Sequence, residues 1–218
     1  MALSLVIGNK NYSSWSMRPW LFLKHGGIEF EEIIVTLYQA DFAERIRKYN
    51  RALRVPVLLE DGASIWDSLA ICEYLAEKVG FGWPRDPMAR AIARSVSAEM
   101  HSGFHAMRSQ YPFNARGRNR RVPQTPELVK DIQRIDEIWQ ECRSRFGEPG
   151  SWLFGAFSIA DAMFVPVVLR FQTYGAPGLS DVSQAYLRAV LADPHVVEWL
   201  RASEAETYAE EDIDSVGR

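Results

Sequence analysis

Three serine hydroxyls, those of Ser13, Ser14 and Ser16, follow a polar, turn-rich segment and lie at the start of a helical pattern. A hydroxyl hydrogen bond and the positive end of a helix both favour an anion over its protonated form. Together they could stabilise a bound anion at this position. Serines in this position can also be N-caps of the helix, and three serines allow both roles.

A second polar pair, Asp67-Ser68, opens an amphipathic helix expected over residues 67–79. The first N–H groups of a helix have no partner within it, and with the positive end of the dipole they suit a carboxylate. The Ser68 hydroxyl would add a further donor. The alternative is that Asp67 or Ser68 only caps the helix.

A polar stripe runs along a long helix that is expected to begin at Asp86-Pro87, with Asp as N-cap and Pro in the first turn. Apolar residues between positions 88 and 107 recur at helical spacing, which predicts one continuous helix. His101, His105 and Arg108 lie on the polar stripe of this helix. A solvated polar face, which most amphipathic helices have, is the alternative to a role in a site.

The elements that would position these groups fall into two parts. Strand and helix patterns over residues 1–80 follow the order βαβαββα, in which the strand–helix–strand opening predicts a parallel pair and Glu60-Asp61-Gly62 a hairpin. Residues 81–86 break the pattern and are predicted to be a linker. Residues 87–218 show only helical patterns, so the expected fold is an α/β domain followed by an all-helical domain. The later helices are expected at about 125–146, 158–174, 180–192 and 194–202.

Composition narrows the class of protein. The chain has 218 residues, of which 47% are hydrophobic and 24% charged, with a formal net charge of −3. This composition is typical of a globular protein and disfavours nucleic acid as the main partner. The N-terminal residues show no signal peptide and no apolar run is long enough to span a membrane, so we expect a cytoplasmic protein with no membrane partner. Cys72 and Cys142 have no metal-ligand spacing, which predicts buried thiols and no metal.

Two charged segments in the second half carry no predicted chemistry. The basic loop over residues 116–126 lacks the aromatic residues of a nucleic-acid surface and is expected to be solvated. The acidic tail that begins at Glu204 is expected to be mobile.

Three local patterns together resemble the cytosolic glutathione S-transferase family along nearly the whole chain. Ser13-Ser14-Trp15-Ser16-Met17-Arg18 is similar to the Ser-Ser-Cys-Ser-x-Arg segment of the zeta class, which contains the maleylacetoacetate isomerases. Val55-Pro56 followed by Asp67-Ser68 resembles the glutathione-binding pair of the family, and Ser158-Ile159-Ala160-Asp161 resembles its buried capping box. The resemblance implies a thioredoxin-like N-terminal domain, an all-helical C-terminal domain, and glutathione as co-substrate.

The resemblance assigns roles to individual residues. It places the catalytic hydroxyl on Ser13, with Ser14, Ser16 and, at lower rank, Tyr12 as rivals. It implies that Ser14 and Trp15 also contact glutathione. In the same comparison, Ser68 receives the γ-glutamyl carboxylate and Asp67 the α-amino group.

Structural roles also follow from the resemblance. A cis bond before Pro56 would free the Val55 backbone to pair with the cysteinyl part of glutathione, as an added strand would. Ser158 and Asp161 would cap a helix. His101, His105 and Arg108 would line an electrophile pocket between the domains, which would suit a carboxylate-bearing substrate or an enolate.

Two positions depart from the family pattern. Trp15 stands where the zeta class has Cys, which weakens an assignment as a maleylacetoacetate isomerase and excludes a mixed disulfide with glutathione in this loop. Residues 50–54 lack the frequent Asn-Pro start, which leaves open whether Arg54 reaches the glycine carboxylate.

The predicted function is a glutathione transferase of the detoxification type that adds the thiolate to a small electrophile. A zeta-like glutathione-dependent cis–trans isomerase is the alternative within enzymes. A non-catalytic adaptor or ligand carrier with the same fold is the alternative of another class, disfavoured because the binding residues are present. The resemblance also implies a homodimer.

Overall fold

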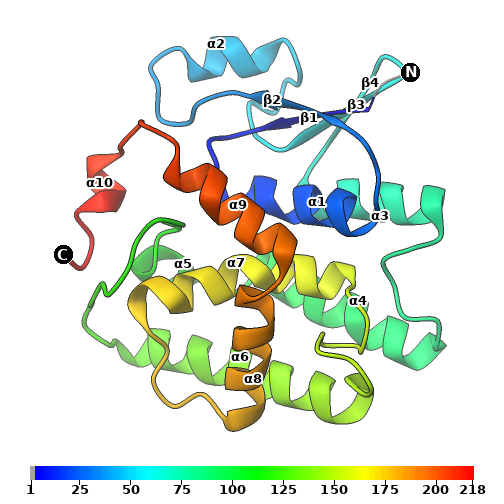
Figure 1. Cartoon of the computed structure of the whole chain (residues 1–218). Coiled ribbons are helices and arrows are strands. Elements are labelled where there is room, and N and C mark those ends of the chain that lie inside the picture. The colour runs from blue at the N-terminus through cyan, green and yellow to red at the C-terminus, as the bar shows by residue number, and fades with distance from the viewer. Residues whose placement is uncertain (1–2) are drawn as a thin grey trace.

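A four-stranded sheet with helices on both faces forms the first part of the chain in the computed structural model, which describes residues 3–218 (Figure 1). Its elements are β1 (Ser4–Ile7), α1 (Ser14–His25), β2 (Glu31–Ile34), α2 (Phe42–Arg47), β3 (Val57–Glu60), β4 (Ala63–Trp66) and α3 (Ser68–Val79). The strand order is β2-β1-β3-β4, with β1 and β2 parallel and the other two pairs antiparallel. The predicted βαβαββα order and the thioredoxin-like topology are confirmed.

Side-chain alternation along the strands explains why both faces of the sheet are covered. Leu5 and Ile7 of β1 join the large core with α1 and α3, whereas Val6 packs with Val57 and with Ile46 of α2. Successive side chains of a strand point to opposite faces, so a run of apolar residues requires a cover on each. Figure 1 shows α2 on one side of the sheet and α1 with α3 on the other.

The rest of the chain is helical and packs beneath α1 and α3 (Figure 1). Its elements are α4 (Pro87–Ser102), α5 (His105–Gln110), α6 (Pro126–Phe146), α7 (Ile159–Tyr174), α8 (Asp181–Leu191), α9 (Pro194–Glu204) and α10 (Glu211–Asp214). Every residue of α7 except Gln172 is buried, and α7 packs against α1, α3, α4 and α8. A helix that is apolar on all sides belongs in a core, and this helix joins the two parts of the chain into one core.

The prediction of one continuous helix from residue 86 is wrong in one respect. The helix α4 ends at Ser102, with Gly103 as its C-cap, and a second helix, α5, begins at His105. Phe104 between them has a left-handed backbone, with φ of 60°. The apolar stripe does not reveal this break, since Met100, Phe104 and Met107 are buried on either side of it. The break turns His105 away from the polar stripe of α4.

The acidic tail differs from the mobile segment that we expected, because it is docked on the body of the protein. The Glu206 carboxylate accepts the backbone N–H groups of Lys10 and Asn11, and Asp214, which is 7% exposed, accepts a 2.7 Å hydrogen bond from Asn114 Nδ2. Buried partners for its carboxylates hold the tail in place, which sequence composition alone does not show.

The basic loop is docked as well, against that tail. The Arg116 guanidinium donates to the backbone oxygens of Glu206 and Tyr208, and the Arg121 N–H donates to Gly217 O at 3.0 Å. The loop therefore makes an internal contact with the acidic tail that its composition does not predict, while Arg118, Asn119 and Arg121 are exposed, as expected of a solvated loop.

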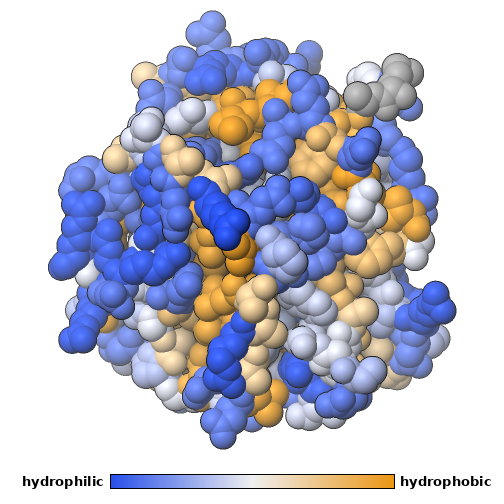
Figure 2. Space-filling model, in the orientation of Figure 1, coloured by the Kyte–Doolittle hydropathy of each residue, from blue (hydrophilic) through white to orange (hydrophobic). Residues whose placement is uncertain are grey.

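The segment between α3 and α4 contains no helix or strand. The division into domains at residues 1–80 and 87–218, with a linker over 81–86, stays a prediction, and residues 1 and 2 of the first domain lie outside the described residues. Among the helices formed by residues 3–218, none has the length and apolar character needed to cross a bilayer. The face of the molecule shown in Figure 2 is mostly hydrophilic, with hydrophobic residues gathered along its centre.

Asp161 ties the start of α7 to the neighbouring loop and to α8. Its carboxylate accepts the N–H groups of Leu153 at 3.0 Å and Ser158 at 2.9 Å, and the Tyr186 hydroxyl at 3.1 Å. Ser158 and Asp161 form the predicted capping box. Complete burial raises the pKa of the Asp161 carboxyl to about 6, although these donors favour its charged form.

We expect Asp161→Ala to lower the free energy of unfolding by about 2–4 kcal/mol, because it removes a cap and leaves buried donors without an acceptor. Urea denaturation at neutral pH measures this loss. Asp181→Ala is the control, since Asp181 is an exposed residue in the first turn of α8. A similar small effect for both variants would contradict a structural role for Asp161.

Candidate functional site

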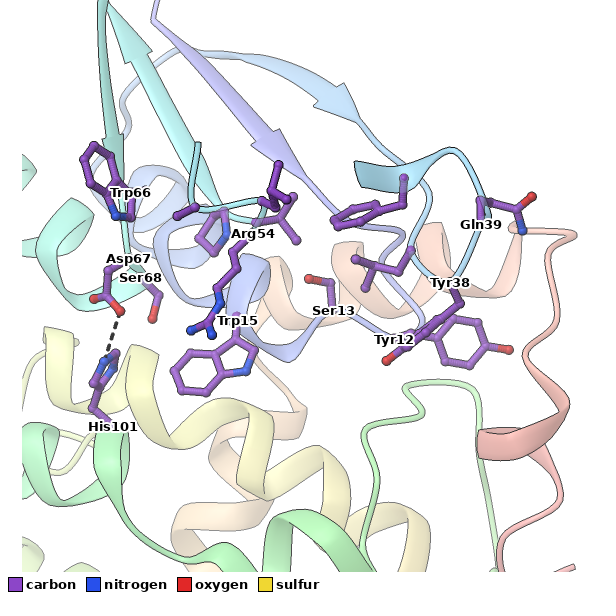
Figure 3. A pocket seen from close by; sticks show the side chains of 16 residues that line it. Tyr12, Ser13, Trp15, Tyr38, Gln39, Arg54, Trp66, Asp67, Ser68 and His101 are labelled. Carbon is purple, nitrogen blue, oxygen red and sulfur yellow. Dashed lines mark ion pairs between the residues drawn. The ribbon is translucent and has the colours of Figure 1, made fainter. Parts of the chain in front are cut away.

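A cavity of about 920 Å³ lies between the end of the sheet and α4. Four segments of the first part of the chain and one helix of the second part line it: the start of α1, the loop after β2, the loop before β3, the start of α3, and α4 (Figure 3). Of the predicted glutathione contacts, Trp15, Val55, Asp67 and Ser68 line this cavity, whereas Ser14 does not.

The three serines have different environments. Ser13 is the N-cap of α1 and lines the cavity. Ser14 is buried, and its Oγ lies 3.4 Å from the Arg170 guanidinium that donates to it. Ser16 is fully buried; its Oγ accepts the Gly8 N–H at 3.1 Å and lies 2.7 Å from Ser13 Oγ. Ser13 is therefore the serine of this group whose hydroxyl a molecule in the cavity can reach.

Tyr12 also lines the cavity, but its hydroxyl is already engaged. It donates to Asp214 Oδ2 at 2.7 Å and accepts the Glu210 N–H at 3.0 Å and an Arg116 N–H at 3.1 Å. Burial and the hydrogen bond to Asp214 raise the pKa of the Tyr12 phenol. Because this hydroxyl holds the C-terminal tail, it has no proton left to donate into the cavity.

The start of α3 forms the opposite end of the cavity, with Asp67 held in a backbone conformation of φ 76°. Its Oδ1 accepts the N–H groups of Leu69 and Ala70, and its Oδ2 lies 3.1 Å from His101 Nε2 on α4 (Figure 3). Partial burial acts to raise the pKa of the Asp67 carboxyl, but His101 and the two N–H groups outweigh it and hold this pKa below its ordinary value. Ser68 is buried and its Oγ accepts an Arg18 N–H at 3.3 Å.

The loop before β3 supplies the third wall. The Val55–Pro56 bond is cis, as the resemblance implies. The Arg54 side chain reaches into the cavity in Figure 3, and no carboxylate among residues 3–218 forms an ion pair with it. The cavity thus presents a reachable hydroxyl, a carboxylate and a guanidinium on separate walls.

Two family models match the two parts of the chain. The N-terminal domain model of glutathione S-transferase matches residues 12–78, and the C-terminal domain model matches residues 108–202. The chain belongs to the glutathione S-transferase family.

Individual members of the family are similar over most of the chain. Maleylacetoacetate isomerase of Rattus norvegicus is 27% identical over 185 residues, which cover 80% of this chain and 82% of the relative. A glutathione S-transferase of Arabidopsis thaliana is 27% identical over 202 residues, or 88% of each chain. A solved structure of a glutathione transferase homologue from Burkholderia gl BGR1, with bound glutathione, has a TM-score of 0.72 at 22% identity and covers 94% of this chain and 100% of that one. The zeta-like resemblance and the glutathione S-transferase fold are thereby confirmed.

Trp15, which replaces the zeta-class Cys, lies on the cavity wall and is 36% exposed. The guanidinium carbons of Arg18 and Arg108 lie 4.1 Å and 5.0 Å from its ring centre, and His101 contacts it edge-on at 5.3 Å. Cation–π contacts of this kind hold an aromatic ring in one orientation. In this glutathione S-transferase the indole therefore lies against two guanidinium groups and one imidazole.

The three residues predicted for the electrophile pocket separate in the structure. His101 lines the cavity. Arg108 lies behind Trp15 and donates to the backbone oxygens of Met100 and Gly103, so it stabilises the break after α4. His105 is exposed at the start of α5 and does not line the cavity. The break at Gly103 causes this difference, because a continuous helix would place all three on one face.

Sequence reasoning missed Arg170, which lies beneath the start of α1. It is buried in α7 and donates to Tyr111 O and to Ser14 Oγ. Burial and the nearby charge of Arg108 lower the pKa of Arg170 to about 9, and burial with Arg108 and Arg170 has the same effect on Arg18. A single arginine in the otherwise apolar run over 162–171 is the signal that could have found it.

The two cysteines are buried, as predicted, and burial raises the pKa of the Cys142 thiol to about 12 and raises that of Cys72 further. Neither thiol lines the cavity. Within residues 3–218, no group of three or more His, Cys, Asp and Glu side chains could hold a metal ion.

We expect Asp67→Asn to lower stability only slightly and Asp67→Ala to lower it by about 1–2 kcal/mol, because Asn caps helices and tolerates positive φ while Ala does neither.

The depressed pKa of Asp67 stabilises the fold above the ordinary carboxyl pKa of about 3.9, and this contribution disappears as pH falls through the folded-state value. Its size is small because the side chain is 43% exposed. Urea denaturation of both variants between pH 7 and pH 3 measures these effects; an Asn variant as unstable as Ala would contradict the capping role.

Proposed function

We propose that this glutathione S-transferase binds glutathione in the cavity and uses the Ser13 hydroxyl to stabilise its thiolate. The observation that carries the proposal is the position of Ser13, which caps α1 and faces the same cavity as the start of α3. The hydroxyl and the positive end of α1 both favour the thiolate over the thiol. Addition of that thiolate to a small electrophile is the proposed reaction.

Charged groups on the other walls of the cavity support binding of glutathione with its thiolate at Ser13. Glutathione carries two carboxylates and one ammonium group. At the start of α3, Ser68 would receive the γ-glutamyl carboxylate and Asp67 the α-amino group, which would share the Asp67 carboxylate with His101. Arg54, which forms no ion pair within residues 3–218, would receive the glycine carboxylate. The Val55 backbone between them would pair with the cysteinyl part.

We expect Ser13→Ala to lower turnover on the order of 10²-fold while changing the affinity for glutathione little, because the hydroxyl acts on the charged thiolate. The pKa of the bound thiol, followed by thiolate absorbance against pH, should rise in this variant.

Ser14→Ala is the matched control, since Ser14 is a neighbouring buried serine that does not line the cavity. Loss of turnover in Ser14→Ala with normal turnover in Ser13→Ala would move the catalytic role to Ser14. An unchanged thiol pKa in the wild-type complex would favour a ligand carrier, and no binding at millimolar glutathione would favour an adaptor.

A glutathione-dependent cis–trans isomerase is the second candidate, supported by the similarity to the rat maleylacetoacetate isomerase over 80% of the chain. Such a reaction adds the thiolate to an unsaturated carboxylic acid, allows rotation about the former double bond and expels the thiolate again. His101 on the cavity wall would face the substrate.

Product analysis separates the two candidates. With a maleyl-type acid as substrate, an isomerase yields the trans acid and leaves the total free thiol constant. A transferase yields a stable thioether, and free thiol falls by one equivalent for each substrate consumed. We expect thiol consumption with simple electrophiles; a constant thiol with trans product would establish the isomerase.

The assembly and setting of the protein are part of the same proposal. We infer a homodimer in the cytoplasm, with a detoxification role if transfer is the reaction. Exposed apolar side chains on β4, α3 and the start of α4, namely Trp66, Tyr74 and Met88, support a second copy as the partner.

A further inference from the structure

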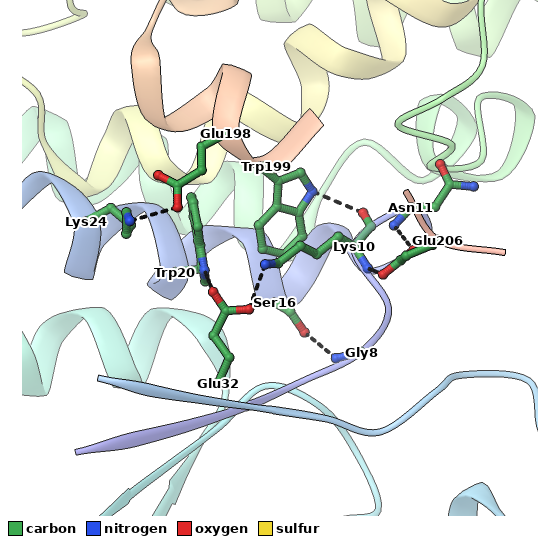
Figure 4. Close-up of polar contacts among 10 residues, drawn as sticks. All are labelled: Gly8, Lys10, Asn11, Ser16, Trp20, Lys24, Glu32, Glu198, Trp199 and Glu206. Carbon is green, nitrogen blue, oxygen red and sulfur yellow. Dashed lines mark hydrogen bonds and ion pairs between the residues drawn. The ribbon is translucent and has the colours of Figure 1, made fainter. Parts of the chain in front are cut away.

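The Ser16 side chain lies directly behind Ser13, between the end of β1 and the first turn of α1. Ser16 is 0% exposed, so no molecule in the cavity touches it. Figure 4 shows its hydroxyl beside the Gly8 N–H, which donates to it at 3.1 Å. Ser13 and Ser16 Oγ atoms are 2.7 Å apart. The two hydroxyls and the Gly8 amide therefore form a short chain that ends at the cavity.

The direction of the protons in this chain follows from counting donors and acceptors. If Ser13 gave its proton to Ser16, the proton of Ser16 would have no other acceptor among residues 3–218, since the hydroxyl contacts only Gly8 N–H and Ser13. A buried donor without an acceptor is costly, and native structures avoid it. If Ser16 instead gives its proton to Ser13, the buried Ser16 hydroxyl is satisfied, and the proton left without an acceptor among residues 3–218 is that of Ser13, which lines the cavity.

That second arrangement also fixes the Ser13 proton. Ser13 Oγ then accepts both the Ser16 hydroxyl and the Ser16 N–H, whose nitrogen is 3.4 Å away. Both lone pairs of Ser13 are then in use, and its own O–H, which has no other acceptor among residues 3–218, is available to a molecule in the cavity. Hydrogen bonds in such a chain polarise one another, which strengthens the last donor.

The backbone around these hydrogen bonds is closely packed at Gly8. A Cβ added to Gly8 would lie 3.0 Å from Ser13 Cβ and 2.8 Å from Leu37 Cγ. Glycine is therefore needed where β1 passes the start of α1, and the close approach sets the distance between the Gly8 amide and Ser16.

We propose that Ser16 is a positioning residue that orients the Ser13 hydroxyl toward the thiolate. This inference rests on the proposed function of Ser13. Ser16 acts only through Ser13: it receives the Gly8 N–H, donates to Ser13 Oγ, and leaves the Ser13 proton free for the sulfur of glutathione. No covalent step is involved.

A double-mutant cycle on the pKa of bound glutathione tests the proposal. Ser16→Ala should raise the thiol pKa by about 1 unit and lower turnover near pH 6.5 about tenfold, with less than about a threefold change in glutathione affinity. In the Ser13→Ala background, Ser16→Ala should change the thiol pKa no further. Ser16→Thr, which keeps a hydroxyl, should restore much of the shift.

Ser203→Ala is the matched control, because Ser203 is equally buried in a helix and its hydroxyl donates to Leu200 O. It should leave the thiol pKa unchanged. A Ser13→Ala variant with a normal thiol pKa would overturn the proposed function itself. A shift in Ser13→Ala without one in Ser16→Ala, or additive shifts in the double variant, would overturn only the role of Ser16.

Neutron diffraction of the wild-type protein with glutathione provides a test that needs no variant and so does not depend on whether Ser16→Ala folds. We expect the Ser16 deuteron on the line to Ser13 Oγ and the Ser13 deuteron directed at the sulfur. A Ser13 deuteron directed at Ser16 would overturn the proposal.

Discussion

The close contact between the end of β1 and the start of α1 determines the geometry of the cavity wall that bears Ser13. Gly8 brings the two segments together, and the turn after it is held from several directions (Figure 4). The Lys10 ammonium lies 2.6 Å from Glu32 on β2 and within 5.5 Å of the ring centres of Trp20 and Trp199. The Trp199 indole donates to Lys10 O at 3.0 Å. Packing and supporting hydrogen bonds of this kind hold the loop in one arrangement and so help to fix the position of Ser13.

Two buried arginines, Arg18 and Arg170, place positive charge beneath the cavity. Arg18 and Arg170 are buried near the start of α1, and neither forms an ion pair with a carboxylate of residues 3–218; their guanidinium groups are satisfied in part by serine hydroxyls and a backbone oxygen. A buried cation without a counter-ion is costly. An anionic ligand in the adjacent cavity would reduce that cost, so the same arrangement that lowers the pKa of these arginines favours a bound anion nearby.

Local patterns predicted elements well, because hydrophobic periodicity and caps act over a few residues. The sequence offered Asp67 or Ser68 as a cap of α3, and the resemblance implied the Ser158–Asp161 box; Asp67 is the N-cap and the box is present. The sequence pattern did not predict the break at Gly103, because the apolar stripe is buried on both sides of it. Contacts between segments distant in sequence were not predicted either. Nothing near Tyr12 in the sequence indicates that its hydroxyl donates to Asp214. Resolving the three serines likewise needed the fold, because which of them faces a cavity depends on the packing of β1 and α7.

The docked tail makes the earliest part of the site depend on the latest part of the chain. The N–H groups of Lys10 and Asn11 find their acceptor in Glu206, and the Tyr12 hydroxyl finds its acceptor in Asp214. During synthesis a protein emerges from its N-terminus onward, and early segments can begin to fold first. In this chain, the polar groups of the turn before Ser13 gain their protein hydrogen-bond partners only after residues almost 200 positions later have been synthesised. The cavity wall that bears Ser13 is thus among the last features of the molecule to be completed, and a nascent chain could hold a formed sheet without a formed cavity.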